Sequence, residues 1–167
     1  ILYGGDNNSQ TDWLYQQFQV VIEPIKDWKI FGEINYKVID AFTHTDYLKV
    51  PQMNVAGEPY SGDTWKTSKV TEGAERTNYF NANVYSEYYR SFADAHHLKA
   101  MVGFQSELFK QRDITAKQNN IMSGIPTLNT TTDNARASGG YQEWATAGFF
   151  GRINYDYKGR YLVEANL

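Results

Sequence analysis

The last twenty residues of the chain, Gly148–Leu167 (GFFGRINYDYKGRYLVEANL), have the pattern of a β-hairpin. We expect its turn at residues 157–160 (YKGR), with one strand on each side. In both strands apolar side chains alternate with polar ones, and successive residues of a strand point to opposite faces of a sheet. The hairpin therefore needs an apolar environment on one face and water on the other.

The same alternation recurs upstream and predicts six antiparallel strands that pair in sequence order. The remaining strands are expected over residues 11–23, 28–47, 78–92, 97–112 and from 143 into the terminal hairpin. Pro24 is expected to end the first strand, because proline cannot donate to a strand ladder. Short turns are expected at residues 24–27 and 93–96, at the same end of the sheet as the turn at 157–160. Long polar segments, expected as loops, cover residues 48–77 and 113–142, and a shorter one covers 4–10.

Composition narrows the class of protein. Aromatic residues make up 16% of the 167 residues, including 13 tyrosines, and tyrosine and tryptophan collect where a ring is apolar at one end and wet at the other. The net charge of −3, without a basic cluster, argues against a nucleic-acid partner. Cysteine is absent, which excludes disulfides and thiolate metal sites. No apolar run approaches the ~18 residues of a membrane helix, so a membrane crossing would use strands.

Short turns on one side and long loops on the other are typical of an outer-membrane β-barrel. Aromatic residues flank the short turns on the apolar face, where an interfacial girdle would lie: Trp28, Phe92, Tyr155, Tyr157 and Tyr161. The alternative is a soluble β-sandwich, with the apolar face packed on a second sheet. Strands of roughly 15 to 20 residues exceed the usual length in globular proteins, which favours the barrel.

The barrel interpretation assigns a direction to each face. We expect lipid contact for Leu98, Ala100, Val102, Phe104, Ile153, Tyr155, Val163 and Ala165. We expect an inward, wet position for Lys99, Gln105, Glu107, Arg152 and Glu164.

Four segments resemble the barrel of SusC/RagA-type TonB-dependent transporters. They are Phe18–Val38, His96–Ala116 (HHLKAMVGFQSELFKQRDITA), Gly124–Thr132 (GIPTLNTTT) and Trp144–Leu167. The resemblance implies an all-β, antiparallel up-and-down transmembrane β-barrel of about 22 strands with a plugged lumen. Residues 1–167 would be a partial TonB-dependent receptor β-barrel of about six strands, without the plug domain and the remaining strands. The chain opens and stops within a pattern, so we expect it to be a piece of a longer protein.

The resemblance also implies a function, namely import of glycans or peptides across a Gram-negative outer membrane. The partners implied are a SusD-like surface lipoprotein, the TonB complex that supplies energy, the glycan or peptide substrate, and membrane lipids. Two alternatives stay open. One is a passive porin-type barrel without a plug, and the other is a soluble glycan-binding β-domain of the same system.

Motifs for catalysis or metal binding are absent from the sequence. No Ser-His-Asp order and no interpretable carboxylate pair stands out, so neither an enzyme nor a cofactor is expected. His96 and His97 are adjacent, and adjacent strand residues point apart, which disfavours a shared metal ion. His44 stands alone in the sequence. Residues 6–9 (DNNS) lack the spacing of a calcium loop.

The candidate binding residues are polar or aromatic positions on the inward face. The polar positions expected to line the lumen are Asn35, Lys37, Asn81, Asn83, Gln105, Arg152 and Asn154. Near the outer rim, an aromatic ring and a few polar groups predict contacts to a sugar or peptide from Glu107, Arg112 and Trp144.

Overall fold

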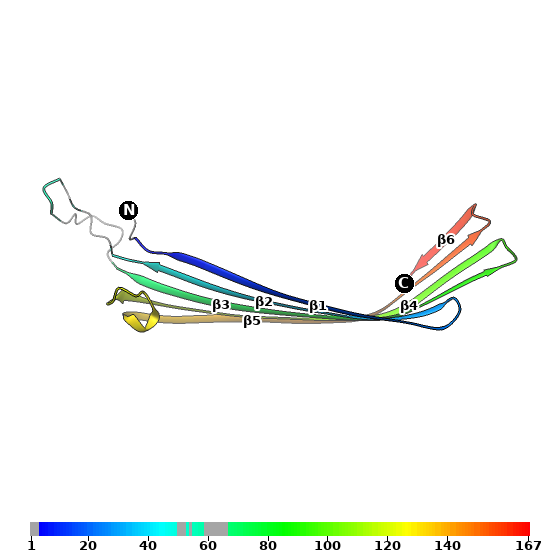
Figure 1. Ribbon diagram of the computed structural model, residues 1–167, viewed down its shortest axis with the longest axis horizontal. Coiled ribbons are helices and arrows are strands. Elements are labelled where there is room, and N and C mark those ends of the chain that lie inside the picture. The colour runs from blue at the N-terminus through cyan, green and yellow to red at the C-terminus, as the bar shows by residue number, and fades with distance from the viewer. Residues whose placement is uncertain (1–3, 50–52, 54, 59–66) are drawn as a thin grey trace. The chain divides into compact units, whose positions relative to one another are not determined.

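The computed structural model describes residues 4–49, 53, 55–58 and 67–167 and shows one six-stranded sheet (Figure 1). The strands are β1 (Asn7–Ile25), β2 (Trp28–Tyr47), β3 (Lys69–Phe92), β4 (His96–Ile121), β5 (Thr131–Tyr157) and β6 (Tyr161–Asn166), with a short 3-10 helix η1 (Leu128–Thr130). They are ordered β1-β2-β3-β4-β5-β6, so every strand pairs with its neighbours in sequence. The prediction of an all-β, up-and-down antiparallel arrangement of six strands is confirmed.

The strands pass through two compact units. The first unit comprises residues 1–13, 39–77 and 111–142, and the second comprises residues 14–38, 78–110 and 143–167. The second unit contains all three short turns, at residues 26–27, 93–95 and 158–160. The first unit contains the connections from β2 to β3 and from β4 to β5.

The terminal hairpin forms as predicted. Tyr157 pairs with Tyr161 at the turn, and the register continues to Arg152 and Asn166. Lys158 and Gly159 have φ angles of 54° and 66°, a region that tight hairpin turns require and that glycine enters without steric cost. The Arg160 N–H donates to the Tyr157 carbonyl oxygen at 3.1 Å, which closes the turn.

The predicted long loops are the main error of the sequence analysis. Residues 113–121 belong to β4 and residues 131–142 to β5, so the expected loop over 113–142 shrinks to the connection around η1. These segments are rich in Asn, Thr, Ser and Gly and lack apolar alternation. Their backbones pair nevertheless, because a strand ladder is built from main-chain groups and needs no apolar face.

The same error occurs at two other places. Residues 69–77 belong to β3, although the expected loop ran to residue 77, and residues 7–10 belong to β1. Within the expected loop 48–77, residues 50–52, 54 and 59–66 lie outside the described residues. Pro24 does not end the first strand, because β1 continues to Ile25; β1 is at the edge of this sheet, where proline is tolerated.

Very few apolar side chains are buried. Among the described residues only Val38, Val70 and Ala95 form a buried apolar set. Large apolar side chains are exposed in contrast, with Phe149 at 79% and Phe18 at 65%. The described residues form one sheet, without the second layer that a β-sandwich would need to cover its apolar face. In the part of the chain that the structure describes, no helix has the length and apolar character needed to cross a membrane.

Candidate functional site

A row of asparagine side chains crosses β2 and β3 in the second unit. Asn81, which is buried, accepts hydrogen bonds on Oδ1 from Asn35 Nδ2 at 3.2 Å and from Asn83 Nδ2 at 3.1 Å. All three were predicted to line a wet face. The Oδ1 atoms of Asn83 and Asn154 are buried and have no hydrogen-bond donor among the described residues.

Glu107 on β4 is the centre of the polar network. Its Oε1 accepts from Tyr79 OH at 2.9 Å, from Gln105 Nε2 at 2.8 Å and from Asn81 Nδ2 at 3.5 Å. Its Oε2 accepts from Thr146 Oγ1 at 3.4 Å. No lysine or arginine in the described part of the chain lies within ion-pair distance of this carboxylate. Neutral donors therefore fix its position without cancelling its charge.

Aromatic rings stand beside this carboxylate. The Trp144 ring lies 6.4 Å from the Tyr79 ring and stacks on Phe109 at 5.4 Å, measured between centroids. Tyr79 thus connects Glu107 with Trp144, two of the three residues predicted to contact a ligand. The structure does not bring Arg112 into this cluster. Arg112 belongs to the first unit, where its guanidinium carbon lies 5.4 Å from the centroid of Tyr141.

A second carboxylate, Glu33 on β2, has a similar environment. Its Oε1 accepts from Gln19 Nε2 at 2.8 Å and from Tyr85 OH at 3.2 Å. The Tyr85 ring stacks on Phe31 at 4.6 Å, with an interplanar angle of 9°. Neither Glu33 nor Tyr85 is among the binding residues predicted from the sequence. The one sequence signal for them is that both lie on the polar face of strands in which apolar and polar residues alternate.

The remaining predicted inward residues make polar contacts within the second unit. Lys99 pairs with Glu87 at 3.2 Å, and Arg152 Nε donates to Asn166 Oδ1 at 2.8 Å. Lys37 lies with its Nζ 5.2 Å from the ring centroid of Tyr15. On the apolar side, Phe104 packs against Phe149 with centroids 5.2 Å apart. Phe104 thus makes an apolar contact, whereas Tyr155, which was also predicted to contact lipid, makes a polar contact with His96.

The two adjacent histidines have different partners. His96 Nδ1 lies 2.6 Å from Tyr155 OH, and His97 Nδ1 lies 2.8 Å from Ser91 Oγ. Among the described residues no group of three His, Cys, Asp or Glu side chains is arranged to hold a metal ion.

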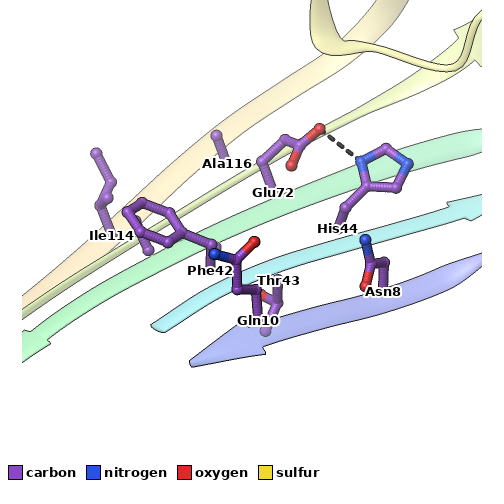
Figure 2. Close-up of a pocket in the computed structure, with 10 residues that line it drawn as sticks. Asn8, Gln10, Phe42, Thr43, His44, Glu72, Ile114 and Ala116 are labelled. Carbon is purple, nitrogen blue, oxygen red and sulfur yellow. Dashed lines mark hydrogen bonds and ion pairs between the residues drawn. The ribbon is translucent and has the colours of Figure 1, made fainter. Parts of the chain in front are cut away.

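The first unit contains a recess of about 300 Å³ on strands β1 to β4 (Figure 2). Its polar lining includes Asn8, Gln10, His44 and Glu72, and its apolar lining includes Phe42 and Ile114. Figure 2 shows these side chains on one side of the ribbons, with a dashed line joining His44 and Glu72.

His44, which looked isolated in the sequence, lies between two carboxylates. Its Nδ1 is 2.7 Å from Glu72 Oε1, and its Nε2 is 3.4 Å from Asp46 Oδ1. Asp46 is buried and also accepts the Asp6 backbone N–H at 3.0 Å. The hydrogen bond to Glu72 is the main cause that raises the pKa of His44, and Asp46 adds to it, while burial opposes them. The charged imidazolium is therefore favoured here.

Comparison with known proteins identifies the fold. Neither a protein-family model nor a curated protein matches the sequence. Among solved structures, the RagAB peptide transporter matches 96% of this chain with a TM-score of 0.83 and 18% sequence identity. The fold is that of a segment of RagAB. Structures of the RagAB peptide importer in the closed-closed and open-open states match with TM-scores of 0.78 and 0.79.

The match to RagAB covers a small part of the RagAB chains at low sequence identity. This chain spans 17% of the matched RagAB chains, and its sequence identity to them is 18–19%. The resemblance to SusC/RagA-type transporters is thus confirmed for the fold. The solved RagAB proteins are described as peptide transporters or importers, and none of these three descriptions is of an enzyme.

Proposed function

We propose that this chain is part of the β-barrel of a SusC/RagA-type TonB-dependent transporter in a Gram-negative outer membrane. The observation that carries the proposal is the match of 96% of the chain to RagAB at a TM-score of 0.83. The plug domain and the remaining strands of the barrel would belong to the rest of the same polypeptide. The role is transport, without catalysis and without a cofactor.

The chemistry of the sheet supports a membrane setting. Its large apolar side chains are exposed, and its second unit separates apolar contacts from a polar network. In lipid the apolar side would be covered, whereas in water it would be an apolar surface larger than soluble monomers tolerate. The exposed apolar side chains therefore favour the barrel over the soluble glycan-binding domain.

The edges of the sheet support the proposal of further strands. Every residue of β1 and every residue of β6 is exposed. An unpaired backbone group in hydrocarbon costs several kcal/mol, so only a closed barrel satisfies such edges in a membrane. We propose that additional strands pair with β1 and β6.

The transported ligand would be a glycan or a peptide, taken up with a SusD-like surface lipoprotein and with energy from the TonB complex. The network around Glu107 and the ring of Trp144 offer hydrogen-bond acceptors and an aromatic surface to such a ligand. Asn35, Asn81, Asn83, Gln105 and Arg152 would line the lumen, together with Lys37 and Asn154. Arg112, which belongs to the first unit, would be a separate ligand contact.

The test is an uptake experiment in cells. The gene for the full polypeptide would be deleted and restored, and growth on single glycans and single peptides would be followed with and without a functional TonB complex. We expect the protein in the outer-membrane fraction and loss of growth on one class of nutrient both after deletion and after inactivation of TonB. Uptake that continues without TonB would favour the passive porin. Purification without detergent would favour the soluble domain.

A further inference from the structure

We infer that the recess of the first unit is a carbohydrate-binding site of a size suited to one sugar ring. The inference goes beyond the proposed transport function, because Glu107, Trp144 and the asparagine row all belong to the second unit. The recess is formed entirely within the first unit, by side chains from four neighbouring strands. Its volume of about 300 Å³ is at the lower end for ligand sites.

The apolar part of the recess is a small platform. Phe42 is 53% exposed and Ile114 is 57% exposed. Phe42 has no aromatic partner among the described residues. An exposed ring of this kind can pack against the C–H face of a sugar, because an aromatic face offers a broad apolar contact with little loss of conformational freedom.

The polar part lies next to this platform. Glu72 uses Oε1 to hold His44, and its Oε2 accepts no hydrogen bond from the residues that the structure describes. A carboxylate oxygen is a strong acceptor for hydroxyl groups. Asn8 makes no side-chain hydrogen bond among the described residues, so its amide retains two donors and an acceptor. Gln10 donates to Asp12 and keeps its carbonyl oxygen.

His44 gives this arrangement its rigidity. It links Glu72 on β3 to Asp46 on β2, and Asp46 in turn binds the backbone of Asp6 just before β1. A carboxylate held in this way loses less freedom when a ligand binds. His44 thus acts as a positioning residue for Glu72.

Other classes of ligand fit the recess less well. An anion would meet Glu72 and Asp46 with one imidazolium to offset them. A purely apolar ligand would desolvate the amides and the carboxylate without replacing their hydrogen bonds. An extended peptide would seek free backbone groups, whereas β2, β3 and β4 are paired on both sides and the open edge of β1 is where we propose a further strand of the barrel. A neutral ring with hydroxyl groups at its edge and C–H groups on its face satisfies both parts of the recess.

Saturation-transfer NMR on the full polypeptide tests the inference. The detergent must carry no sugar, since a maltoside would compete for the recess. The probes are the methyl glycosides of glucose, galactose and mannose, N-acetylglucosamine, and trialanine as a peptide comparison. We expect saturation transfer to at least one sugar, and any transfer to trialanine should be the same in the wild type and in Phe42→Ala. Phe42→Ala should weaken the sugar by about threefold to tenfold, the effect of losing one aromatic contact.

Matched variants make the result decisive. Phe18→Ala removes an exposed phenylalanine of the second unit and should leave sugar binding unchanged. Asn8→Ala, at an exposed position of β1, should weaken binding with little risk to folding. Transfer to no sugar, or a sugar affinity in both Phe42→Ala and Asn8→Ala that equals the wild-type affinity, would overturn the inference. Because TonB-dependent uptake is measured separately, failure of the sugar site leaves the proposed transport function standing.

Discussion

Strands β1 to β5 contribute to both units of the sheet, but the side-chain chemistry of the two units differs. In the second unit, Phe104 packs on Phe149 on one side, while Glu107 gathers neutral donors on the other. Charged pairs occur in both units, for example Lys99 with Glu87 in the second and His44 with Glu72 in the first. The second unit, with apolar contacts and a polar network on different sides, fits a boundary between lipid and water. The recess of the first unit places His44 and Glu72 beside Phe42, and this mixture of polar and apolar side chains fits water. A strand can pass from one setting to the other because its backbone ladder is the same in both.

A charged residue placed on the apolar side of the second unit tests the proposed difference between the two units most strongly. We expect Val102→Arg to destabilise the complete barrel by about 2–4 kcal/mol, the cost of a cation near the middle of a bilayer. Gln105→Arg lies on the polar side of the same strand and should have a small effect. Refolding titrations of the full polypeptide into bilayers measure both. Equal costs would mean that the two faces are wrongly assigned.

The polar side of the second unit is tested by removing its central acceptor. Glu107→Ala leaves the hydroxyl of Tyr79 and the amide of Gln105 without their acceptor. We expect a loss of about 1–3 kcal/mol in the free energy of unfolding, because partners left unsatisfied are costly. Glu107→Gln keeps an acceptor oxygen and should lose less. Glu164→Ala, which breaks a half-exposed pair with Arg152, is the control and should cost under about 1 kcal/mol.

The short turns of the second unit depend on left-handed backbone geometry. Gly159 has a φ of +66° and open space around it, so a side chain there meets strain but no clash. Gly159→Val should cost about 1–2 kcal/mol for the left-handed conformation. Gly148 also has open space, and its φ is not in the left-handed region. Gly148→Val should be nearly neutral in the same refolding titration. If Gly159→Val and Gly148→Val lost equal amounts of free energy of unfolding, backbone strain at Gly159 would not explain the loss.

The first unit should respond to pH through His44. Its folded pKa is raised above 6.5, so its stabilising contribution is complete below about pH 6.5 and is lost as the pH rises through the raised value. The side chains are partly exposed, so we expect less than about 1 kcal/mol. Between pH 5 and 9, the denaturant midpoint of unfolding of the wild type should fall as the pH rises. In His44→Gln the part of this fall that comes from His44 should be absent. His97→Gln is the control, and a slope that survives in His44→Gln would contradict the assignment.

The same difference between units explains what the sequence could predict. The hairpin at residues 148–167 could be predicted from the sequence because apolar and polar side chains alternate along its strands. Lys158-Gly159 also marks the position of the turn. Residues 113–121 and 131–142 have polar side chains on both faces, so no alternation identified them as strands. Alternation of apolar and polar side chains indicates that the two faces of a strand have different environments. Strand formation itself requires only a partner strand for the backbone hydrogen bonds.

Side-chain partners were harder to predict than faces. The sequence predicts Glu107 and Trp144 as ligand contacts from their types and from positions near one end of the expected strands, but they lie near the middle of β4 and β5. Tyr79, which joins them, is not predicted. His44 meets Glu72 across 28 residues of sequence. Such contacts depend on the register between β2 and β3, and a shift of one residue would turn each side chain to the other face. A single sequence with a long connection between the two strands does not fix that register.

Spin-label accessibility tests the central claim that the second unit separates lipid from water. Residues 1–167 contain no cysteine, so single cysteines at Val102, Phe149, Gln105 and Arg152 can carry the label in the full polypeptide, with any cysteine outside these residues replaced by serine and the protein reconstituted in bilayers. Oxygen partitions into lipid, whereas a nickel chelate stays in water. We predict that oxygen relaxes the labels at Val102 and Phe149, and that the chelate relaxes those at Gln105 and Arg152. Equal access of the chelate to all four positions would contradict the account.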